Sequence, residues 1–407
     1  MHIGSAPLSP AGGGARPPPR SAGLSFWYDS AARGALYQAI FVLALGFLLF
    51  EAIVNVRANM QARGIPMDFG FLDNAAGFDI NQSLISYSAA STYGRAFVVG
   101  LLNTCLVAAL GVVLATIIGF SVGVARLSKN WIIAKCAMVY VEALRNVPLL
   151  LQLLVWYNAI LKALPGPRES FALPFDIFLN NRGLFTPQPV LGPAAPWLGA
   201  ALVLGVIAAI ALKVIFLRSK ILGRGFDTFG GGLVAALIAG FPIAVFFIGA
   251  QSISFIFPQL KGFNFSGGAR LLPEFVALVL GLSLYTGAFI AEIVRAGIEA
   301  VPRGQREAAA ALGLSPSQAS GLVVTPQAMR IIIPLLTSQY LNLVKNSSLA
   351  VFIGYPDLVQ VFAGTVLNQT GAAVQVIFIT MAVYLTISLL TSLAMNLYNR
   401  RFTLVER

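Results

Sequence analysis

Residues 96–125 read AFVVGLLNTCLVAALGVVLATIIGFSVGVA, a stretch without a single charged side chain. A transmembrane helix needs about 20 mostly apolar residues, so this stretch is long enough to cross a lipid bilayer. Two further charge-free runs occupy residues 183–212 and 228–260. Over the whole chain 57% of the residues are hydrophobic and 10% are charged, whereas soluble domains carry roughly 25% charged residues. The sequence therefore predicts an integral membrane protein.

Eight segments are apolar over the length that a spanning helix requires. They are centred in residues 35–56, 96–124, 135–163, 196–217, 229–257, 273–294, 331–354 and 374–399. The expected fold class is all-α, a polytopic membrane protein with about eight transmembrane helices. Residues 1–34 are rich in proline and glycine and lack the apolar run of a signal peptide, so we expect a disordered cytoplasmic tail there.

Positive charge is distributed unevenly between the two sides that these spans define. With both termini in the cytoplasm, 17 Lys and Arg residues fall inside and 8 fall outside. Cytoplasmic loops of membrane proteins carry such an excess of Lys and Arg. The remaining two cations, Arg145 and Lys345, lie within predicted spans. The net charge of +12 thus indicates orientation in the membrane, and we expect no nucleic-acid partner.

The longest polar interruption between two spans, residues 299–326, has the pattern of two short helices. Residues 307–312 are strong helix formers, and Gly313 offers the left-handed residue that ends a helix. Ser315 is an N-cap residue followed by a proline, and Gln318 completes a capping box. The charge distribution places this helix, tight turn and second helix in the cytoplasm.

The same segment closely resembles the EAA loop of the permease subunits of binding-protein-dependent ABC importers. In that family the loop is the coupling helix that fits a groove on a cytoplasmic ATPase subunit. The residues that we expect to couple to an ATPase by this resemblance are Gly304, Glu307, Ala308, Ala309, Gly313 and Pro326.

Flanking motifs narrow the resemblance to the polar amino-acid branch, similar to histidine and glutamine permeases. Residues 140–152, YVEALRNVPLLLQ, resemble the signature of that branch in its second core helix, and residues 283–298 and 345–349 match on either side of the loop. The resemblance implies five core helices in residues 90–164 and 271–400. Outside this core lie an extra helix at 35–57, an insertion at 165–270 with two helices, and a cytoplasmic C-terminus at 401–407. This elongated form resembles the longer permease subunits of general L-amino-acid importers.

The resemblance implies a permease subunit of the bacterial inner membrane that takes up L-amino acids delivered by a periplasmic binding protein. It also implies two copies of an ABC ATPase, a second homologous permease subunit and no catalytic activity in this chain. ATP and Mg²⁺ belong to the ATPase, and no cofactor is expected here. The sequence has no Gly-rich P-loop with its lysine, so the chain cannot hold ATP by that means.

Polar residues interrupt the third, sixth and seventh spans, and lipid tolerates them only where they face protein or water. Glu142 and Arg145 are three residues apart and can pair on one helical face, and Glu292 and Arg295 repeat that spacing. Pro148 should open the hydrogen-bond ladder and bend the third span. These polar positions either belong to a translocation path or gate or have a purely structural role, and the sequence leaves both interpretations open. The residues concerned are Glu142, Arg145, Asn146, Pro148, Gln152, Glu292, Arg295, Lys345, Asn346, Ser347 and Ser348.

Two other classes of membrane protein also fit a multispanning chain. An ion-coupled secondary transporter or channel for small polar solutes would use Glu142, Arg145 and Lys345 as its ion site, but it leaves the cytoplasmic helix pair unexplained. A membrane-embedded enzyme is disfavoured, because the single histidine lies in the N-terminal tail. The two cysteines, Cys105 and Cys136, support neither a disulfide framework nor a metal site.

Overall fold

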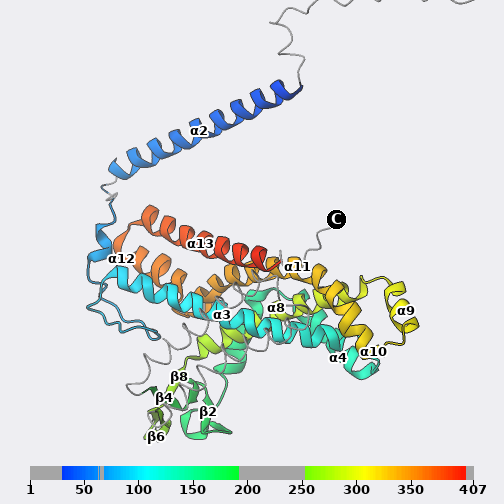
Figure 1. The fold of residues 1–407 in the computed structure, drawn as a ribbon. Coiled ribbons are helices and arrows are strands. Elements are labelled where there is room, and N and C mark those ends of the chain that lie inside the picture. Colours follow the sequence, from blue (N-terminus) through cyan, green and yellow to red (C-terminus); the bar gives the residue numbers. More distant parts are fainter. Residues whose placement is uncertain (1–29, 63, 65–67, 192–252, 400–407) are drawn as a thin grey trace, which may run out of the picture. The chain divides into compact units, whose positions relative to one another are not determined.

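The computed structural model describes residues 30–62, 64, 68–191 and 253–399 (Figure 1). The chain divides into two compact units, Met1–Asp68 and Phe69–Arg407, each with its own internal contacts. Some predictions fall outside the described residues. They concern most of the N-terminal tail, residues 401–407, the span 196–217 and most of the span 229–257.

The described part of the first unit is dominated by one helix, α2 (Ser30–Ala62). Its 33 residues are about 50 Å long at 1.5 Å per residue, more than the hydrocarbon core of a bilayer. Its apolar side chains are exposed, for example Leu43 at 72%, as expected for a helix that lipid surrounds. The predicted extra span at 35–57 is confirmed as an apolar helix, and the predicted tail ends earlier than residue 34 because the helix begins at Ser30.

The second unit is a bundle of helices with a small β-structure at one end (Figure 1). The α-helices are α3 (Tyr93–Ala125), α4 (Trp131–Asn146), α5 (Leu149–Leu154), α8 (Pro273–Glu299), α9 (Arg303–Ala311), α10 (Pro316–Ala319), α11 (Thr325–Asn346), α12 (Leu367–Thr370) and α13 (Ala373–Asn399). Short 3₁₀ or π-helical stretches are η1 (Gly70–Asp73), η2 (Val155–Leu161), η3 (Pro167–Glu169), η5 (Ser320–Val324), η6 (Ser347–Ile353) and η7 (Val359–Val366).

Six of the eight predicted spans coincide with helices in the described residues. Five helices are long and apolar enough to cross a membrane, and α4 with the stretch from α5 to η2 makes a sixth if this bent pair is one span. The fold is thus a helix-rich membrane fold with five to six apolar spans, and the count of eight is not confirmed.

The third predicted span bends at Pro148, as the sequence predicted. α4 and the stretch formed by α5 and η2 meet at 105°. Val147 is extended, because the ring of a following proline disfavours helical backbone. The buried side chain of Gln152 bridges the bend, since its Nε2 donates to the carbonyl oxygens of Leu144 at 2.8 Å and Val147 at 2.9 Å. These carbonyls lie at the end of α4, where no helical donor is left for them.

α8 is the most buried long helix of the second unit, and α3 packs along it at close range. Gly123 permits this approach, because a Cβ atom there would lie 2.7 Å from the Val294 Cβ and 2.8 Å from the Ala291 carbonyl oxygen. One turn earlier, Gly119 faces Ile290 in the same way. The Gly119–Gly123 spacing is typical of close helix packing in membranes and serves the architecture.

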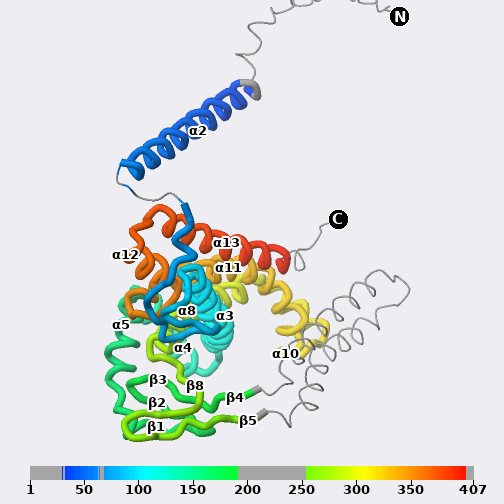
Figure 2. The backbone as a smooth tube through the Cα atoms, turned by 90° about the vertical axis from the view of Figure 1, so that its left-hand side faces the viewer, coloured from blue at the N-terminus to red at the C-terminus, as the bar shows by residue number. Residues whose placement is uncertain are grey.

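The predicted insertion contains small antiparallel sheets (Figure 2). One sheet has the strand order β1-β2-β3-β8, while β4 pairs with β5 and β6 pairs with β7. The strands are β1 (Phe171–Leu173), β2 (Ile177–Asn180), β3 (Gly183–Thr186), β4 (Gln188–Leu191), β5 (Ile253–Ile256), β6 (Gln259–Lys261), β7 (Asn264–Ser266) and β8 (Ala269–Leu271). The expectation of an all-α chain is wrong for these segments, and the predicted span 229–257 ends in a strand instead of a helix.

The sequence pattern did not predict these strands, and the reason is physical. Strands of three or four residues are too short to display a clear alternation of apolar and polar side chains. The β1–β2 hairpin turns at Phe175 and Asp176, which have positive φ angles of 66° and 54°, as in a type I′ turn. Because neither residue is glycine, the usual hairpin signal is missing.

The four-stranded sheet and the predicted coupling segment lie at opposite ends of α8. β8 ends just before α8 begins, whereas α9 follows the end of α8 after a short turn. α8 has 27 residues and a length of about 40 Å. This separation is the one that the charge count expects, since it placed residues 162–182 and 261–270 outside and residues 299–326 inside.

Candidate functional site

Residues 299–326, the segment that the charge count places in the cytoplasm, form two short helices joined by a tight turn. Gly313 adopts a left-handed φ of 77° just after α9, and its amide donates to the Ala310 carbonyl at 2.9 Å. The Ser315 hydroxyl accepts a hydrogen bond from the Gln318 amide, and the Gln318 side chain accepts one from the Ser315 amide. The predicted helix, turn and helix are confirmed, together with the capping box.

α9 is tied to the two long helices that flank it in the chain. Arg306 Nη2 donates to the carbonyl oxygen of Ile298, near the end of α8, at 3.1 Å. Gln327 Nε2, in the first turn of α11, donates to Gln305 Oε1 at 3.2 Å. Ala309 is only 2% exposed, so α9 is also packed against the rest of the unit. These contacts hold α9 to α8 and α11.

Two large apolar side chains of the segment are exposed. Leu312 is 82% exposed and Leu322 is 68% exposed. Other exposed residues of the segment are Gly304, Glu307, Ala308, Gly313 and Pro326. We call these seven residues the docking surface. Ala309 also belongs to the predicted coupling residues, but it is buried and is not part of this surface, so its role in coupling stays a prediction.

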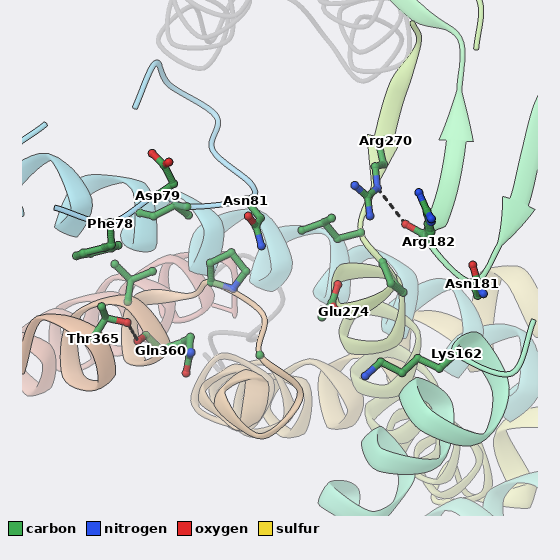
Figure 3. Close-up of a pocket in the computed structure, with 16 residues that line it drawn as sticks. Phe78, Asp79, Asn81, Lys162, Asn181, Arg182, Arg270, Glu274, Gln360 and Thr365 are labelled. Atoms are coloured by element: carbon green, nitrogen blue, oxygen red, sulfur yellow. Dashed lines mark hydrogen bonds between the residues drawn. The ribbon is translucent and has the colours of Figure 1, made fainter. Parts of the chain in front are cut away.

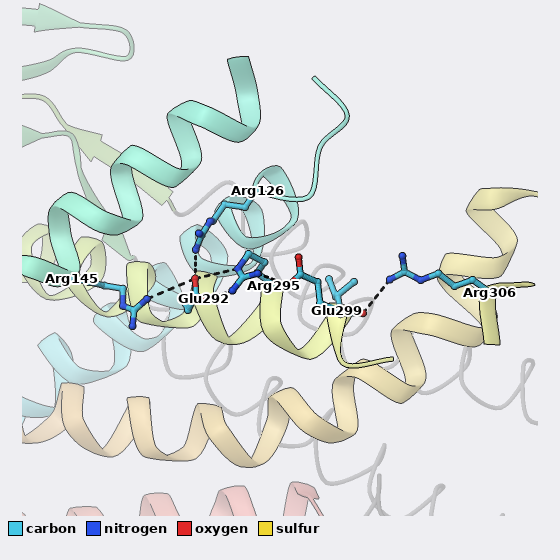
Figure 4. Close-up of polar contacts among 7 residues, drawn as sticks. Arg126, Arg145, Glu292, Arg295, Glu299 and Arg306 are labelled. Atoms are coloured by element: carbon cyan, nitrogen blue, oxygen red, sulfur yellow. Dashed lines mark hydrogen bonds and ion pairs between the residues drawn. The ribbon is translucent and has the colours of Figure 1, made fainter. Parts of the chain in front are cut away.

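A cluster of charged side chains lies where α3, α4 and α8 meet (Figure 4). Glu292 Oε1 accepts a hydrogen bond from Arg295 Nη2 at 2.5 Å, and Glu292 Oε2 accepts one from Arg126. Arg145 Nη1 lies 3.8 Å from Glu292 Oε2, and Arg295 pairs further with Glu299. We call Arg126, Arg145, Glu292, Arg295 and Glu299 the Glu292 cluster.

The Glu292 cluster joins three helices through one carboxylate. The side chains of Arg126 and Glu292 are 14% and 25% exposed, so solvent screens their attraction less than it would on an open surface. Arg126 follows the end of α3, and Arg145 lies in the last turn of α4, next to the bend at Pro148. The cluster therefore connects the bent span to the helix that continues into the docking surface.

One predicted ion pair is wrong. The Glu142 side chain is exposed, and among the described residues it forms no ion pair. Arg145 turns instead to Glu292 and places its guanidinium 5.2 Å from the centre of the Phe289 ring. Spacing on one helix permits a pair, but a second helix here offers Arg145 both a carboxylate and an aromatic face. The other predicted pair, Glu292 with Arg295, is confirmed.

The polar residues at the end of α11 lie apart from the cluster's contacts. Lys345 is exposed in the last turn of α11, where the helix dipole favours a cation. Ser347 Oγ donates to the Val344 carbonyl at 2.8 Å, and Ser348 Oγ donates to the Lys345 carbonyl at 2.7 Å. These hydroxyls bond to their own helical segment. A role in a path for Lys345, Asn346, Ser347 and Ser348, and for Asn146 at the end of α4, stays a prediction.

Sequence reasoning missed Arg126 and Arg306. Both had been counted as cytoplasmic cations, and such a count treats them only as signals of orientation. Arg126 and Glu292 are 166 residues apart in the chain, so no local spacing reports their contact. The available signal was that arginines lie in or next to the same three predicted spans, at residues 126, 145 and 295.

The fold and these two features define a multispanning membrane protein with an exposed helix pair linked to a bent span. Residues 111–404 match the family described as the binding-protein-dependent transport system inner membrane component. The match covers more than half of the chain, and the chain belongs to this family. It is a multi-pass permease component of the inner membrane, and family membership does not favour an ion-coupled transporter.

Curated relatives match nearly the whole chain. YhdX of Escherichia coli (strain K12), named as an amino-acid ABC transporter permease protein, is 50% identical over 94% of this chain and 97% of its own. The general L-amino acid transport system permease protein AapQ of Rhizobium johnstonii (strain DSM 114642 / LMG 32736 / 3841) is 48% identical over 94% of this chain and 95% of its own. A crystal structure of an amino acid ABC transporter with histidines is 23% identical, covers 76% of this chain and 95% of its own, and has a TM-score of 0.46.

Proposed function

We propose that this chain is the permease subunit of an ABC importer for L-amino acids and that its docking surface receives a cytoplasmic ATPase. The observation that carries the proposal is the capped helix pair of α9 and α10, in which α9 is held to α8 and α11 by hydrogen bonds while Leu312 and Leu322 are exposed. Apolar side chains at the centre of a small protein interface supply much of its affinity.

The substrate class rests on the relatives. AapQ and YhdX are named as permeases for amino acids, and both match more than nine-tenths of this chain. We infer that the present chain also imports L-amino acids. A periplasmic binding protein delivers them, a second homologous permease subunit completes the channel, and two ATPase copies bind ATP and Mg²⁺. Both termini lie in the cytoplasm in this arrangement.

The Glu292 cluster gives the proposal a mechanism. Closure of the ATPase pair moves α9, and the hydrogen bond between Arg306 and the Ile298 carbonyl carries that movement into α8. Glu292 then moves relative to Arg126 and Arg145, which belong to the ends of α3 and α4. The cluster and the bend at Pro148 thus act as the cytoplasmic gate.

Uptake by intact cells tests the energy source. Cells lacking their own high-affinity uptake receive this chain with its partner subunits and are given radiolabelled L-amino acids. Arsenate lowers ATP and should abolish uptake, whereas a protonophore in cells that still make ATP by glycolysis should leave uptake largely intact. Uptake that survives ATP depletion and collapses with the proton gradient would contradict the proposal and support an ion-coupled transporter.

A further inference from the structure

A cavity of about 560 Å³ opens where the four-stranded sheet meets the helical bundle (Figure 3). Its walls come from the β2–β3 turn, β8, the first turn of α8, the end of η2, and the segments 78–81 and 354–365. Small-molecule sites have volumes of about 300–1,000 Å³. The cavity lies at the opposite end of α8 from the docking surface, on the side that the charge count places outside.

Three cations line this cavity: Lys162, Arg182 and Arg270. Arg270 Nε donates to the carbonyl oxygen of Arg182 at 3.0 Å, and Lys162 Nζ lies 4.3 Å from the centre of the Tyr157 ring. The first contact positions the Arg270 guanidinium and the second positions the Lys162 ammonium, and neither contact neutralises the charge. Arg182 takes part in the first contact through its backbone carbonyl, and its exposed side chain lines the cavity. Among the residues that the structure describes, none of the three forms an ion pair with a carboxylate. The wall therefore attracts an anionic group.

Two carboxylates, Asp79 and Glu274, line the same cavity. Glu274 Oε1 accepts a hydrogen bond from the Tyr157 hydroxyl at 2.6 Å, and Glu274 lies in the first turn of α8, where the helix dipole favours negative charge. Neither carboxylate has an ion-pair partner in the described part of the chain. In Figure 3 the side chain of Glu274 lies between those of Arg270 and Lys162. The cavity thus presents unpaired charges of both signs to one bound molecule.

We propose that this cavity is a binding site for a free zwitterionic α-amino acid on the outer side of the permease. The α-carboxylate binds at Arg182 and Arg270, because guanidinium groups match carboxylates in geometry and charge. The α-ammonium binds at Glu274. Three cations against two carboxylates give the lining a net charge of +1. Acidic and neutral amino acids therefore bind more tightly than lysine or arginine.

This site rests on the proposed function and extends it. It makes the permease itself a recognition element, which holds the amino acid after the binding protein releases it and before it enters the path. The inserted sheet supplies Arg182 and Arg270, so the insertion acquires a role in substrate recognition.

The test measures equilibrium binding of radiolabelled L-glutamate and L-lysine to the full-length chain in lipid nanodiscs, without binding protein or ATPase. L-Glutamate should bind saturably, and L-lysine at least 5-fold more weakly. Arg182→Gln should raise the Kd for L-glutamate at least 10-fold without changing the thermal unfolding midpoint. Arg168→Gln is the matched control, because Arg168 lies over the Phe263 ring at 4.1 Å and is not part of the cavity lining. α-Carboxamide and N-acetyl analogues should both bind poorly.

Each failure has a distinct meaning. Absence of saturable L-glutamate binding by the unmodified chain, or equal binding by Arg182→Gln, overturns the proposed site. If Arg182→Gln lowers uptake by cells although the purified chain binds no amino acid, the cations contact the binding protein, and the site proposal falls while the importer stands. If the chain binds L-glutamate but cells import no amino acid, the site survives and the proposed function fails.

Discussion

Arg145 Nη1 of α4 lies 3.8 Å from Glu292 Oε2 of α8, across the junction between the bent span and the helix that leads to the docking surface. The same carboxylate accepts shorter hydrogen bonds from Arg126 and Arg295. At 3.8 Å the Arg145 contact is longer than a charge-assisted hydrogen bond, which measures about 2.7–2.9 Å. Arg145 is thus the most loosely held of the three arginines around Glu292.

Glu292→Gln should uncouple the docking surface from the gate. The amide removes the negative charge that holds Arg126, Arg145 and Arg295 together, at a cost of roughly 1–2 kcal/mol for a partly exposed cluster. A coupling loss of that size lowers amino-acid uptake by about 10-fold. ATPase activity and uptake measured on the same reconstituted complex should show ATP hydrolysis that no longer depends on the loaded binding protein.

Glu142→Gln is the matched control for that variant. Glu142 is a carboxylate on α4 that is exposed and forms no ion pair within the described ranges. Its removal should change neither uptake nor the coupling ratio. Equal losses in Glu142→Gln and Glu292→Gln would show that the cluster has no special part in coupling.

Arg306→Ala should weaken coupling while leaving the ATPase bound. The variant loses the hydrogen bond to the Ile298 carbonyl but keeps both exposed leucines of the docking surface. We expect a roughly 5-fold lower uptake at the lower end of typical coupling energies. Arg303→Ala, also on the exposed part of α9, should behave like the unmodified chain. Loss of ATPase co-purification in Arg306→Ala would assign this arginine to docking instead of transmission.

Gly123→Ala should destabilise the bundle. The added Cβ meets the Val294 Cβ at 2.7 Å and the Ala291 carbonyl at 2.8 Å, so α3 must move away from α8. Overpacking of this kind costs about 1–3 kcal/mol. The thermal unfolding midpoint in detergent should fall, whereas Gly46→Ala on α2, with nothing within 4 Å, should not lower it. An unchanged midpoint in Gly123→Ala would contradict the close packing of α3 on α8.

Asp357 predicts a pH dependence of stability. Its side chain is 1% exposed, and burial raises the pKa of the Asp357 carboxyl to about 7, although the Gln360 amide donates to Oδ1 at 2.8 Å. Between the pKa of an unfolded aspartate, about 4, and pH 7, the folded state binds more protons than the unfolded state. Stability therefore falls as the pH rises through this window. Asp357→Asn keeps the acceptor and should remove this component of the pH dependence, measured as the unfolding midpoint from pH 4 to 8.

The long helices and the coupling segment followed from local patterns. The charge-free run 96–125 lies almost wholly in α3, and the glycine, cap and capping-box residues of 313–318 are read within one turn of the chain. The bend at Pro148 is equally local, because proline and its neighbour alone disfavour continuous helix. Such features depend on residues only a few positions apart.

The contacts that give the site its shape could not be predicted from residues close together in the sequence. Arg145 pairs with Glu292 and not with Glu142, because α8 packs beside α4. The cavity is lined by Lys162, Arg182 and Glu274, which come from different elements. The strands of the insertion are too short to display the alternation of apolar and polar side chains that marks a strand. Their pairing also joins distant parts of the sequence, since β3 pairs with β8. Tertiary packing decides all of these features.

The proposed importer works only if an ATPase binds the docking surface of α9 and α10. Its most direct test is co-purification of the ATPase with the C-terminally tagged chain from gently solubilised membranes, for the unmodified chain and for Leu312→Asp. Because Leu312 is 82% exposed, the variant should insert and fold normally. We predict that the ATPase and a second permease subunit accompany the unmodified chain and that Leu312→Asp loses the ATPase alone. Equal recovery of the ATPase with both proteins, or recovery of the unmodified chain by itself, would contradict the account.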